Sequence, residues 1–465
     1  MNRRKFGIMG ASSLAALSAY MGGIRPALAA ADPNLLKTTL MPMGGERAGN
    51  ADGSIPAWNG GLTQIPTGWK PSDGLMPDFF ADDKKLYSVD ASNMEQYADK
   101  LAEGTKLMMQ KYGFRIDVYP THRTASAPQW VYDNIATNVT AAATVPKGAK
   151  YGFTGAFGGV PFPILDKDPA VAGAQAMWNH ATLWQGQAWT RAQANYLVDS
   201  TGHLTLAAGY KQYADFLYYL KGGTVADYKG LYAKYFVKFL APASMVGQES
   251  IDWFPTNMLQ TPERVWSYLP GQGRMREDPN LTYDTPAPSF DDYANSDEYD
   301  IFYGALDRYD WKLVGKKEML VPYNNNKLYH ATAQEGHMKH FLNPDLVRWE
   351  LHRVWVIDAV VAPGKRNVLH HRRIYLDEDT WTACLGDSWD AQGNYWRHGT
   401  TTIENRPDIP AGALFSTCAL YDLQANHYLT EVGIWNQAPY NQEVVLGIPP
   451  LQLFNPQAMA AQAQY

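Results

Sequence analysis

The histidine residues are the first candidates for chemistry in this chain. His337 and His340 are three positions apart, so on a helix they would share one face. A metal ion would need further ligands of the same kind, and Glu335 is the one such residue close by. His370 and His371 are adjacent, and on a strand their side chains would point to opposite faces. The histidines therefore predict no metal site.

Other catalytic patterns are also missing from the sequence. There is no Gly-x-Ser-x-Gly elbow, no His-Glu-x-x-His pair and no dinucleotide fingerprint. Residues 151–165 are rich in glycine, but no Lys-Ser/Thr pair follows them, as a phosphate-binding loop would require. We therefore predict no catalytic residue, no metal and no cofactor.

The charged residues form two groups, and each group has a simple structural interpretation. Asp291-Asp292 and residues 297–300 lie in a stretch rich in Pro and Ser, which favours a solvated loop over a carboxylate pair. Arg353, the Arg372-Arg373 pair and Asp358 fall on expected strands. We expect them to form cross-strand ion pairs on the outside of a sheet.

The overall charge excludes one class of function. The 465-residue chain has a formal charge of −6. Residues 1–29 contain Arg3, Arg4, Lys5 and Arg25 and no acidic residue, so the remainder is more acidic still. Binding to nucleic acid needs a basic face that neutralises phosphates. We therefore expect no nucleic-acid partner.

Residues 1–29 have the three-part layout of an export signal. A basic start precedes an apolar stretch and an Ala27-Leu28-Ala29 ending. The Arg3-Arg4 pair favours twin-arginine export, with general secretory export as the alternative. Cleavage near Ala29 would leave no cysteine at the new terminus, so we expect a periplasmic protein without a lipid anchor.

The chain contains two cysteines, Cys384 and Cys418. An oxidising compartment permits a disulfide between them. Two separate buried thiols are the alternative, because sequence spacing says nothing about whether their Cα atoms come within about 7 Å.

Helix and strand patterns divide the remainder into two parts. Residues 30–80 are rich in Gly, Pro and Asp and predict an extended arm, and residues 81–465 predict a single domain. Helical spacing occurs early in that domain, over 94–112, 127–145, 169–184 and 220–240, with a short piece near 345–349. Alternating runs separated by turn residues follow, at 192–199, 203–210, 263–270, 310–323, 350–361, 368–376, 380–386, 394–403, 413–422 and 427–435.

The stretch 310–323 predicts a single long strand. Gly315 in its middle favours a bulge or a bend. With a period of two, Trp311, Leu313, Met319 and Val321 would share one apolar face. We therefore interpret it as the bent wall of a cavity.

Short turns between successive strands imply antiparallel pairing, since parallel strands need long crossovers. The predicted fold class is α+β: a large curved antiparallel sheet forming an unclosed half-barrel, with helices over its concave face and the extended N-terminal arm. Aromatic residues make up 13% of the chain, which suits an apolar cavity between the layers. The candidate lining residues are Trp253, Phe254, Trp311, Leu313, Trp355, Tyr375, Trp381 and Trp396.

Several long motifs resemble those of a known family. They are "MGGERAGNADGSIPAWNGG", "YPTHRTASAPQWVYDN", "GAFGGVPFPI", "AMWNH", "RYDWKLVGKKEMLVPYN" and "ELHRVWVIDAVVAPGKR". Together they resemble domain-of-unknown-function family 1329 of Gram-negative bacteria, from about Leu40 to Gly433. The resemblance implies a fold similar to the LolA/LolB-type lipoprotein carriers. It also implies association with exporters of the resistance-nodulation-division type and with outer-membrane proteins. It brings no catalytic residue.

Three hypotheses about function follow. The first is a periplasmic carrier that buries a lipid, an acyl chain or a sterol-like molecule and works with an envelope transport system. The second is an enzyme acting on a hydrophobic substrate in the same cavity. The third is a non-catalytic accessory subunit of an envelope transporter. A bound lipid would support the first, a bound metal or cofactor the second, and a cavity filled by side chains the third.

Overall fold

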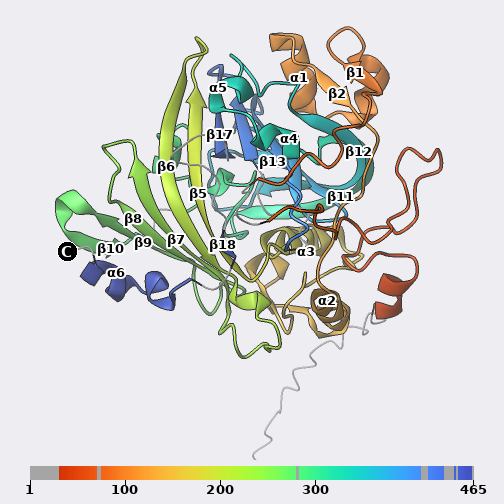
Figure 1. The fold of residues 1–465 in the computed structure, drawn as a ribbon. Helices are drawn as coiled ribbons and strands as arrows, with labels where there is room; N and C mark the ends of the chain where they lie inside the picture. Colours follow the sequence, from red (N-terminus) through yellow and green to blue (C-terminus); the bar gives the residue numbers. More distant parts are fainter. Residues whose placement is uncertain are drawn as a thin grey trace, which may run out of the picture. The chain divides into compact units, whose positions relative to one another are not determined.

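One large sheet organises the chain from Asp32 onward (Figure 1). The computed structural model describes residues 31–70, 75–278, 282–409, 417–433, 445–446 and 449–462, and the predicted signal segment lies outside them. Sixteen described strands join the sheet. Pairing is antiparallel except where β2 (Ile116–Val118) runs beside the start of β12 (Arg348–Val361). The sheet is not closed, which confirms the predicted fold class.

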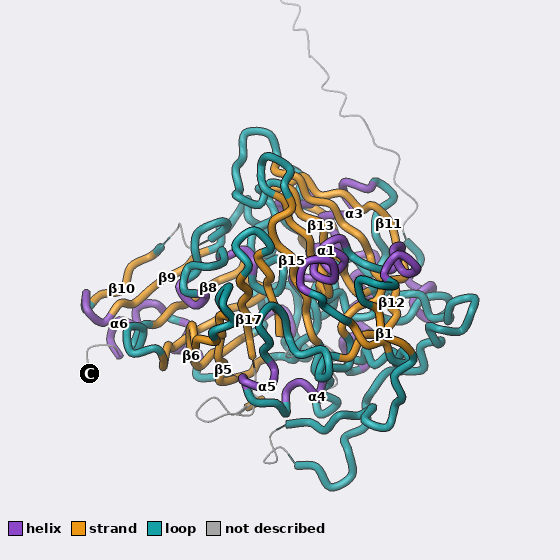
Figure 2. The backbone as a smooth tube through the Cα atoms, turned by 90° about the horizontal axis from the view of Figure 1, so that it is seen from above, coloured by secondary structure: helices purple, strands orange, loops and turns teal. Residues whose placement is uncertain are grey.

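Two antiparallel meanders make up most of this sheet. The first contains β5 (Ala188–Val198), β6 (Leu204–Asp215), β7 (Leu231–Ala241), β8 (Glu249–Pro255), β9 (Arg264–Leu269) and β10 (Arg274–Glu277). The second contains β12, β13 (His371–Asp377), β14 (Ala383–Trp389), β15 (Tyr395–Thr402), β16 (Thr417–Asp422) and β17 (His427–Gly433). β17 pairs with β5 and joins the two. Figure 2 shows the strands passing from β10 at one side to β12 at the other.

This topology dictates the path of one connection. β10 lies at one end of the strand order, and β11 (Tyr309–Pro322), the next strand in the chain, pairs with β12 at the other end. The chain between them must therefore cross the width of the sheet. We call Thr282–Arg308 the covering segment, and it contains two short helical turns, η7 (Pro288–Phe290) and η8 (Ser296–Glu298).

The remaining described strands are short. β1 (Tyr87–Val89) pairs with β2, β18 (Val445–Leu446) pairs with β5, and β3 (Ala143–Thr144) and β4 (Phe153–Thr154) form a separate ribbon. The short helices and helical turns are η1 (Pro33–Lys37), η3 (Met94–Lys100), η4 (Ala149–Tyr151), η5 (Leu217–Tyr219), η6 (Pro270–Gln272), α4 (Asn326–Tyr329), α5 (Ala333–Gly336), η9 (Leu451–Phe454) and α6 (Pro456–Gln462). No helix among the described residues has the length and apolar character needed to cross a bilayer.

Apolar side chains alternate between the two faces of the sheet and form two core clusters. The first core cluster includes Ile357 and Leu420 and packs against α2 (Gln129–Ala141) and α3 (Pro169–Ala181). The second includes Val356 and Tyr421 and packs against α1 (Glu103–Tyr112). Because adjacent strand residues point to opposite faces, both faces are buried. Helices thus lie on both sides of the sheet.

The contact between α3 and β11 depends on Gly173. A Cβ atom at Gly173 would lie 2.7 Å from the backbone nitrogen of Lys312 and 2.9 Å from that of Leu313. In Gly173→Ala the clash should cost roughly 1–3 kcal/mol, because backbone atoms yield less readily than flexible side chains. The gain of about 1 kcal/mol that alanine brings to a helix offsets part of this cost, so the free energy of unfolding should fall by up to about 2 kcal/mol. Urea denaturation would measure the loss.

The matched control is Gly271→Ala, because a Cβ at Gly271 meets no atom within 4 Å. That variant should be close to neutral. Equal stability for both variants would contradict the close packing of α3 on β11.

The bulge predicted near Gly315 is present, but its consequence differs from the prediction. The register with β12 shifts between Leu313 and Gly315. A one-residue shift exchanges the faces of all residues beyond it. Trp311 and Leu313 therefore lie with the first core cluster, whereas Met319 and Val321 belong to the second. The single continuous apolar face predicted for this strand was wrong.

Two predicted helices were also wrong. Most of the stretch 220–240 forms β7, whose aromatic residues suit a strand as well as a helix. In a short apolar run, the 3.6-residue period of a helix and the two-residue period of a strand are hard to tell apart. Residues 348–349 begin β12, and the nearby helices are α4 and α5 instead. The helices at 94–112, 127–145 and 169–184 are confirmed as η3 with α1, as α2 and as α3.

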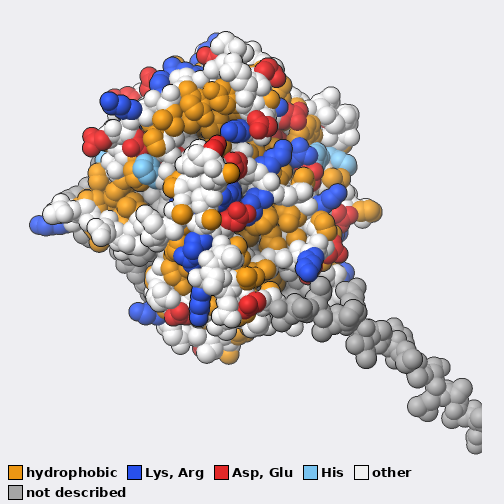
Figure 3. Space-filling model, turned by 90° about the vertical axis from the view of Figure 1, so that its right-hand side faces the viewer, with side chains coloured by type: hydrophobic (Ala, Val, Ile, Leu, Met, Phe, Trp, Pro, Cys, Tyr) orange, Lys and Arg blue, Asp and Glu red, His pale blue; other side chains and the backbone are white. Residues whose placement is uncertain are grey.

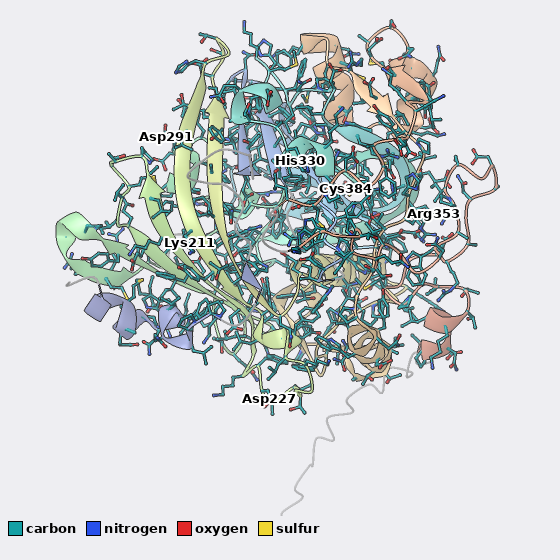
Figure 4. All side chains as sticks on the ribbon, viewed as in Figure 1. Lys211, Asp227, Asp291, His330, Arg353 and Cys384 are labelled. Carbon is teal, nitrogen blue, oxygen red and sulfur yellow. The ribbon has the colours of Figure 1, made fainter. Side chains whose placement is uncertain are left out.

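The arm is attached by side chains of the body that bond to its backbone. The Trp381 indole donates to the Met43 carbonyl at 2.8 Å, and Arg123 donates to the Glu46 carbonyl at 2.6 Å. Arg353 donates to the Ala48 carbonyl at 3.0 Å. Figure 4 labels Arg353 on the side of the molecule where the arm runs. Backbone outside helices and sheets needs such donors, because no regular backbone hydrogen bonds reach its carbonyl groups.

Cys384 and Cys418 are buried free thiols. Cys384 lies in β14 and Cys418 in β16, with β15 between them, so their backbones are about two strand spacings apart. A register shift beside Cys384 turns it toward the second core cluster, whereas Cys418 belongs to the first. Both facts prevent a disulfide.

Candidate functional site: an acidic cavity under the covering segment

A cavity lies between strands β6–β9 and the covering segment. Its main part has a volume of about 290 Å³ and an adjoining part about 100 Å³. Phe239, Ser250, Asp252, Ser289, Tyr299 and Tyr303 line both parts, so they form one continuous space. Binding sites for small molecules begin at about 300 Å³, and this cavity reaches that range.

Strand periodicity explains which side chains face the cavity. Ser250, Asp252 and Phe254 of β8 line it. Ile251 and Trp253, between them, pack on the opposite face against the C-terminal segment. Val265 and Ser267 of β9 continue the same wall. The wall is a period-two pattern that combines apolar rings with small and acidic side chains.

Buried ion pairs hold the covering segment in place. Asp297 is 2.7 Å from a guanidinium nitrogen of Arg372, and Glu298 pairs with Arg397. Burial is the main cause that raises the pKa of Asp297, and Arg372 opposes it. The expected solvated loop at 297–300 was therefore wrong, because arginines on β13 and β15 draw these carboxyls into the interior. Arg372 is likewise buried and not on the outer face.

Close packing adds to this attachment. Ile301 lies against Gly386 and Gly399, where a Cβ atom would approach its side chain to 2.5 and 3.0 Å. At the other end of the segment, Asn195 of β5 donates to the Ser289 carbonyl at 3.0 Å. In Figure 4, Asp291 of the covering segment is labelled on the same side of the view as Lys211 of β6. The segment is thus an integral wall of the cavity.

Two carboxyl groups in the cavity have strongly altered acidity. Burial raises the pKa of Asp252 to about 7. Burial, together with the neighbouring Asp252, Asp297 and Asp307, raises the pKa of Glu263 to about 8, opposed by a hydrogen bond from the Ala305 backbone. No described residue forms an ion pair or hydrogen bond with Asp252. Both residues are half-buried, and a carboxyl in such a recess without a cationic partner is harder to ionise than one on an open surface.

The other charged groups around the cavity have partners. Glu249 pairs with Lys238 at 3.1 Å, and Asp278 pairs with Arg276 at 2.8 Å. Arg191 bonds to Gln212 and lies over the Trp189 ring at 4.2 Å. These contacts leave Asp252 and Glu263 as the uncompensated charges of the main part.

The acidity of Asp252 predicts a pH effect on stability. Its raised pKa means that the folded protein keeps this proton more firmly than the unfolded chain. The contribution is complete below about pH 4 and is lost as the pH rises through about 7. Asp252→Asn should therefore gain stability over the parent by up to about 3 kcal/mol between pH 5 and pH 8. Urea unfolding of the variant and the parent at pH 5 and at pH 8 measures this gain. The same difference in unfolding free energy at both pH values would contradict the prediction.

Of the eight residues predicted to line a cavity, Phe254 lines this one. Trp253 lies on the opposite face of β8, where its indole donates to the Phe454 carbonyl at 3.1 Å and its ring is 4.8 Å from that of Trp266. The two predicted neighbours were thus assigned to one surface although strand geometry separates them.

Four of the predicted residues lie with the first core cluster but away from the cavity. Trp311 packs on Phe302 at 4.9 Å between ring centres, and Leu313 is half-buried at the edge of the cluster. Trp355 lies parallel to Trp381 at 6.2 Å. These residues join the sheet to α3 and to the arm.

The last two predicted residues take part in polar contacts. Tyr375 is buried in the second core cluster, where its hydroxyl donates to Asp387 at 3.1 Å. The Trp396 indole donates to Asp422 at 2.8 Å. Sequence reasoning missed Asp252 and Glu263, although an acid two positions before Phe254 in "SIDWFP" was a usable signal.

One arrangement resembles a catalytic triad but is inaccessible. His398 is 3.1 Å from the Thr105 hydroxyl and 2.9 Å from Asp387. All three side chains are buried, and Asp387 also accepts from the backbone at the start of α1. The group therefore anchors α1. Among the described residues, no three His, Cys, Asp or Glu side chains are placed to hold a metal ion.

Comparison with known proteins identifies the family. Residues 88–460 match the model for DUF1329, described as a protein of unknown function. The chain belongs to the DUF1329 family. This confirms the resemblance seen in the motifs. The protein PA3922 of Pseudomonas aeruginosa is similar to this DUF1329 chain, with 34% identity over 446 residues and 91% of each chain covered.

Solved structures that align with this chain have lower identity. A putative outer-membrane lipoprotein-sorting protein domain from Vibrio parahaemolyticus aligns with a TM-score of 0.40 and 12% identity, covering 63% of this chain and 99% of its own. A DUF1329 protein from Desulfovibrio piger aligns with a TM-score of 0.38 and 15% identity, and the alignment covers 57% of this chain and 91% of that protein. A LolA-superfamily protein from Nitrosomonas europaea aligns with a TM-score of 0.34 and 9% identity, and the alignment covers 61% of this chain and 97% of that protein.

Proposed function

We propose that this protein is a periplasmic carrier that binds one hydrophobic molecule in the cavity under the covering segment. The observation that supports this most is the continuous, partly open cavity of about 290 and 100 Å³ between the sheet and the covering segment. A space of this size, walled by Phe254, Tyr299 and Tyr303, suits an apolar guest.

The volume limits the ligand to a single acyl chain or a compact ring system. Each methylene group moved from water into such a space contributes about 0.8 kcal/mol. The position of the cavity also supports a carrier, since the covering segment encloses the ligand on one side and the sheet on the other.

The proposed location rests on the export signal predicted at residues 1–29, with cleavage near Ala29. On the face seen in Figure 3, basic and acidic side chains are interspersed, without one broad basic patch. The partners implied by the family resemblance, an inner-membrane exporter of the resistance-nodulation-division type and an outer-membrane protein, belong to this proposal too. Co-purification after cross-linking in cells would test them.

Titration with straight-chain alcohols of increasing length tests the binding itself. Displacement of a neutral fluorescent probe should strengthen by about fourfold per added methylene, which corresponds to 0.8 kcal/mol, until the cavity is full. Beyond that length the affinity should level off. Absence of probe binding, or an affinity that does not change with chain length, would contradict the proposal.

A further inference from the structure

The distribution of charge inside the cavity is one-sided. Besides the paired Glu249 and Asp278, the main part contains Asp252 and Glu263, while its described cation is Arg276, already paired with Asp278. The adjoining part contains Asp300 and Glu431 beside Arg191. In the main part, a bound molecule would therefore meet Asp252 and Glu263, for which the described wall provides no cationic partner.

Asp252 and Glu263 lie next to each other on this wall. Asp252 is opposite Val265 in the pairing of β8 with β9. Glu263 is two positions before Val265, so it shares that face and lies diagonally across from Asp252. Their mutual repulsion is among the causes that raise the pKa of Glu263. The pair thus forms one acceptor site at the side of an apolar space.

We infer that the ligand has an apolar body and a polar group that donates hydrogen bonds, a hydroxyl or an ammonium, and that this group binds at Asp252 and Glu263. The inference rests on the proposed function and specifies its ligand. Carboxylate and phosphate amphiphiles are correspondingly disfavoured in this cavity.

The physical reason is the cost of unpaired charge in a recess that is only partly open to solvent. A donor satisfies the carboxyl of Asp252, which the described protein leaves without a partner. An anionic head would instead be placed beside two acids, where like charges repel each other and water is partly excluded. Tyr235 and Tyr303 line the same space, and their hydroxyls can accept from the ligand as well as donate to it.

Three amphiphiles with equal chains test the inference: dodecanol, dodecylamine and dodecanoate. Each is used to displace a neutral fluorescent probe from the full mature protein near pH 8. We expect the amine and the alcohol to bind at least about tenfold more tightly than the carboxylate. Tighter binding of either the amine or the alcohol supports a donor group. Which of the two binds more tightly shows whether the ligand interacts with ionised or with neutral carboxyl groups. A carboxylate that binds as tightly as the other two would overturn the inference.

Two variants connect this preference to the site. Asp252→Asn and Glu263→Gln should each reduce the advantage of the amine over the carboxylate by about tenfold. Asp227→Asn, at an exposed turn residue labelled in Figure 4, should leave it unchanged. An unchanged preference in both cavity variants would contradict the assignment of the site.

The proposed function and this inference fail in different ways. If the parent protein binds no probe, the carrier proposal itself fails. If probe and all three amphiphiles bind but with equal affinity, the carrier proposal stands and the inference about the polar group fails.

Discussion

Ser250→Phe is expected to weaken the binding of a hydrophobic probe by about 15- to 200-fold. Ser250 lines both parts of the cavity, so a benzyl group at this position fills their junction. Excluding two to four methylene groups of the ligand costs roughly 1.6 to 3.2 kcal/mol, which corresponds to that range. No described contact places the Ser250 hydroxyl in a hydrogen bond, so the protein loses no internal contact. Probe titration measures the effect.

Thr205→Phe is the matched control for this variant. Thr205 is exposed on β6 and does not line the cavity. The same side chain is thereby introduced into the same meander without reaching the proposed site. If both variants bind the probe like the parent, the ligand is bound elsewhere and the assigned cavity is wrong.

Arg123→Ala should lower the free energy of unfolding by about 3–5 kcal/mol. The Arg123 guanidinium is buried and forms two hydrogen bonds to Asp379, at 2.7 and 2.6 Å. It also donates to the arm carbonyls of Glu46, Arg47 and Pro56. Without it, Asp379 keeps a buried charge and the arm loses a main attachment. These ion pairs and hydrogen bonds raise the pKa of Arg123, although its burial opposes this.

Arg264→Ala provides the comparison for that loss. Arg264 also bonds to a carboxylate with two nitrogens, at 2.9 and 2.8 Å to Glu277, but these side chains are 39% and 43% exposed. An exposed pair of this kind contributes about 0–1 kcal/mol. Urea denaturation would measure the free energy of unfolding of both variants. The slope of that free energy against urea concentration should be compared with the slope of the parent. Similar losses for the two would show that the arm is not anchored through Arg123.

Much of the fold was predictable because its signals are local. Alternation and turn residues identified most strands from β5 to β17, and the helical spacing over 169–184 identified α3. The position of the bulge followed from Gly315 alone. Its effect on the faces of β11 did not, because the register shift depends on how the extra residue is accommodated against β12.

The candidate site was less predictable, because it is assembled from distant parts of the chain. Asp297 and Glu298 look like solvated acids until Arg372 and Arg397, contributed by two other strands, are placed beside them. The covering segment gains its role from the strand order, since β11 pairs at the far end of the sheet from β10. Aromatic composition predicted an apolar space but could not separate Phe254, which lines it, from Trp253, which does not.

Native mass spectrometry of the protein purified from a Gram-negative host tests the central claim most directly. The account predicts one bound small hydrophobic molecule per chain, which organic solvent extracts and which is missing from Ser250→Phe but present in Thr205→Phe. A parent protein that carries no such molecule, and that after extraction takes up neither dodecanol nor dodecylamine, would contradict it.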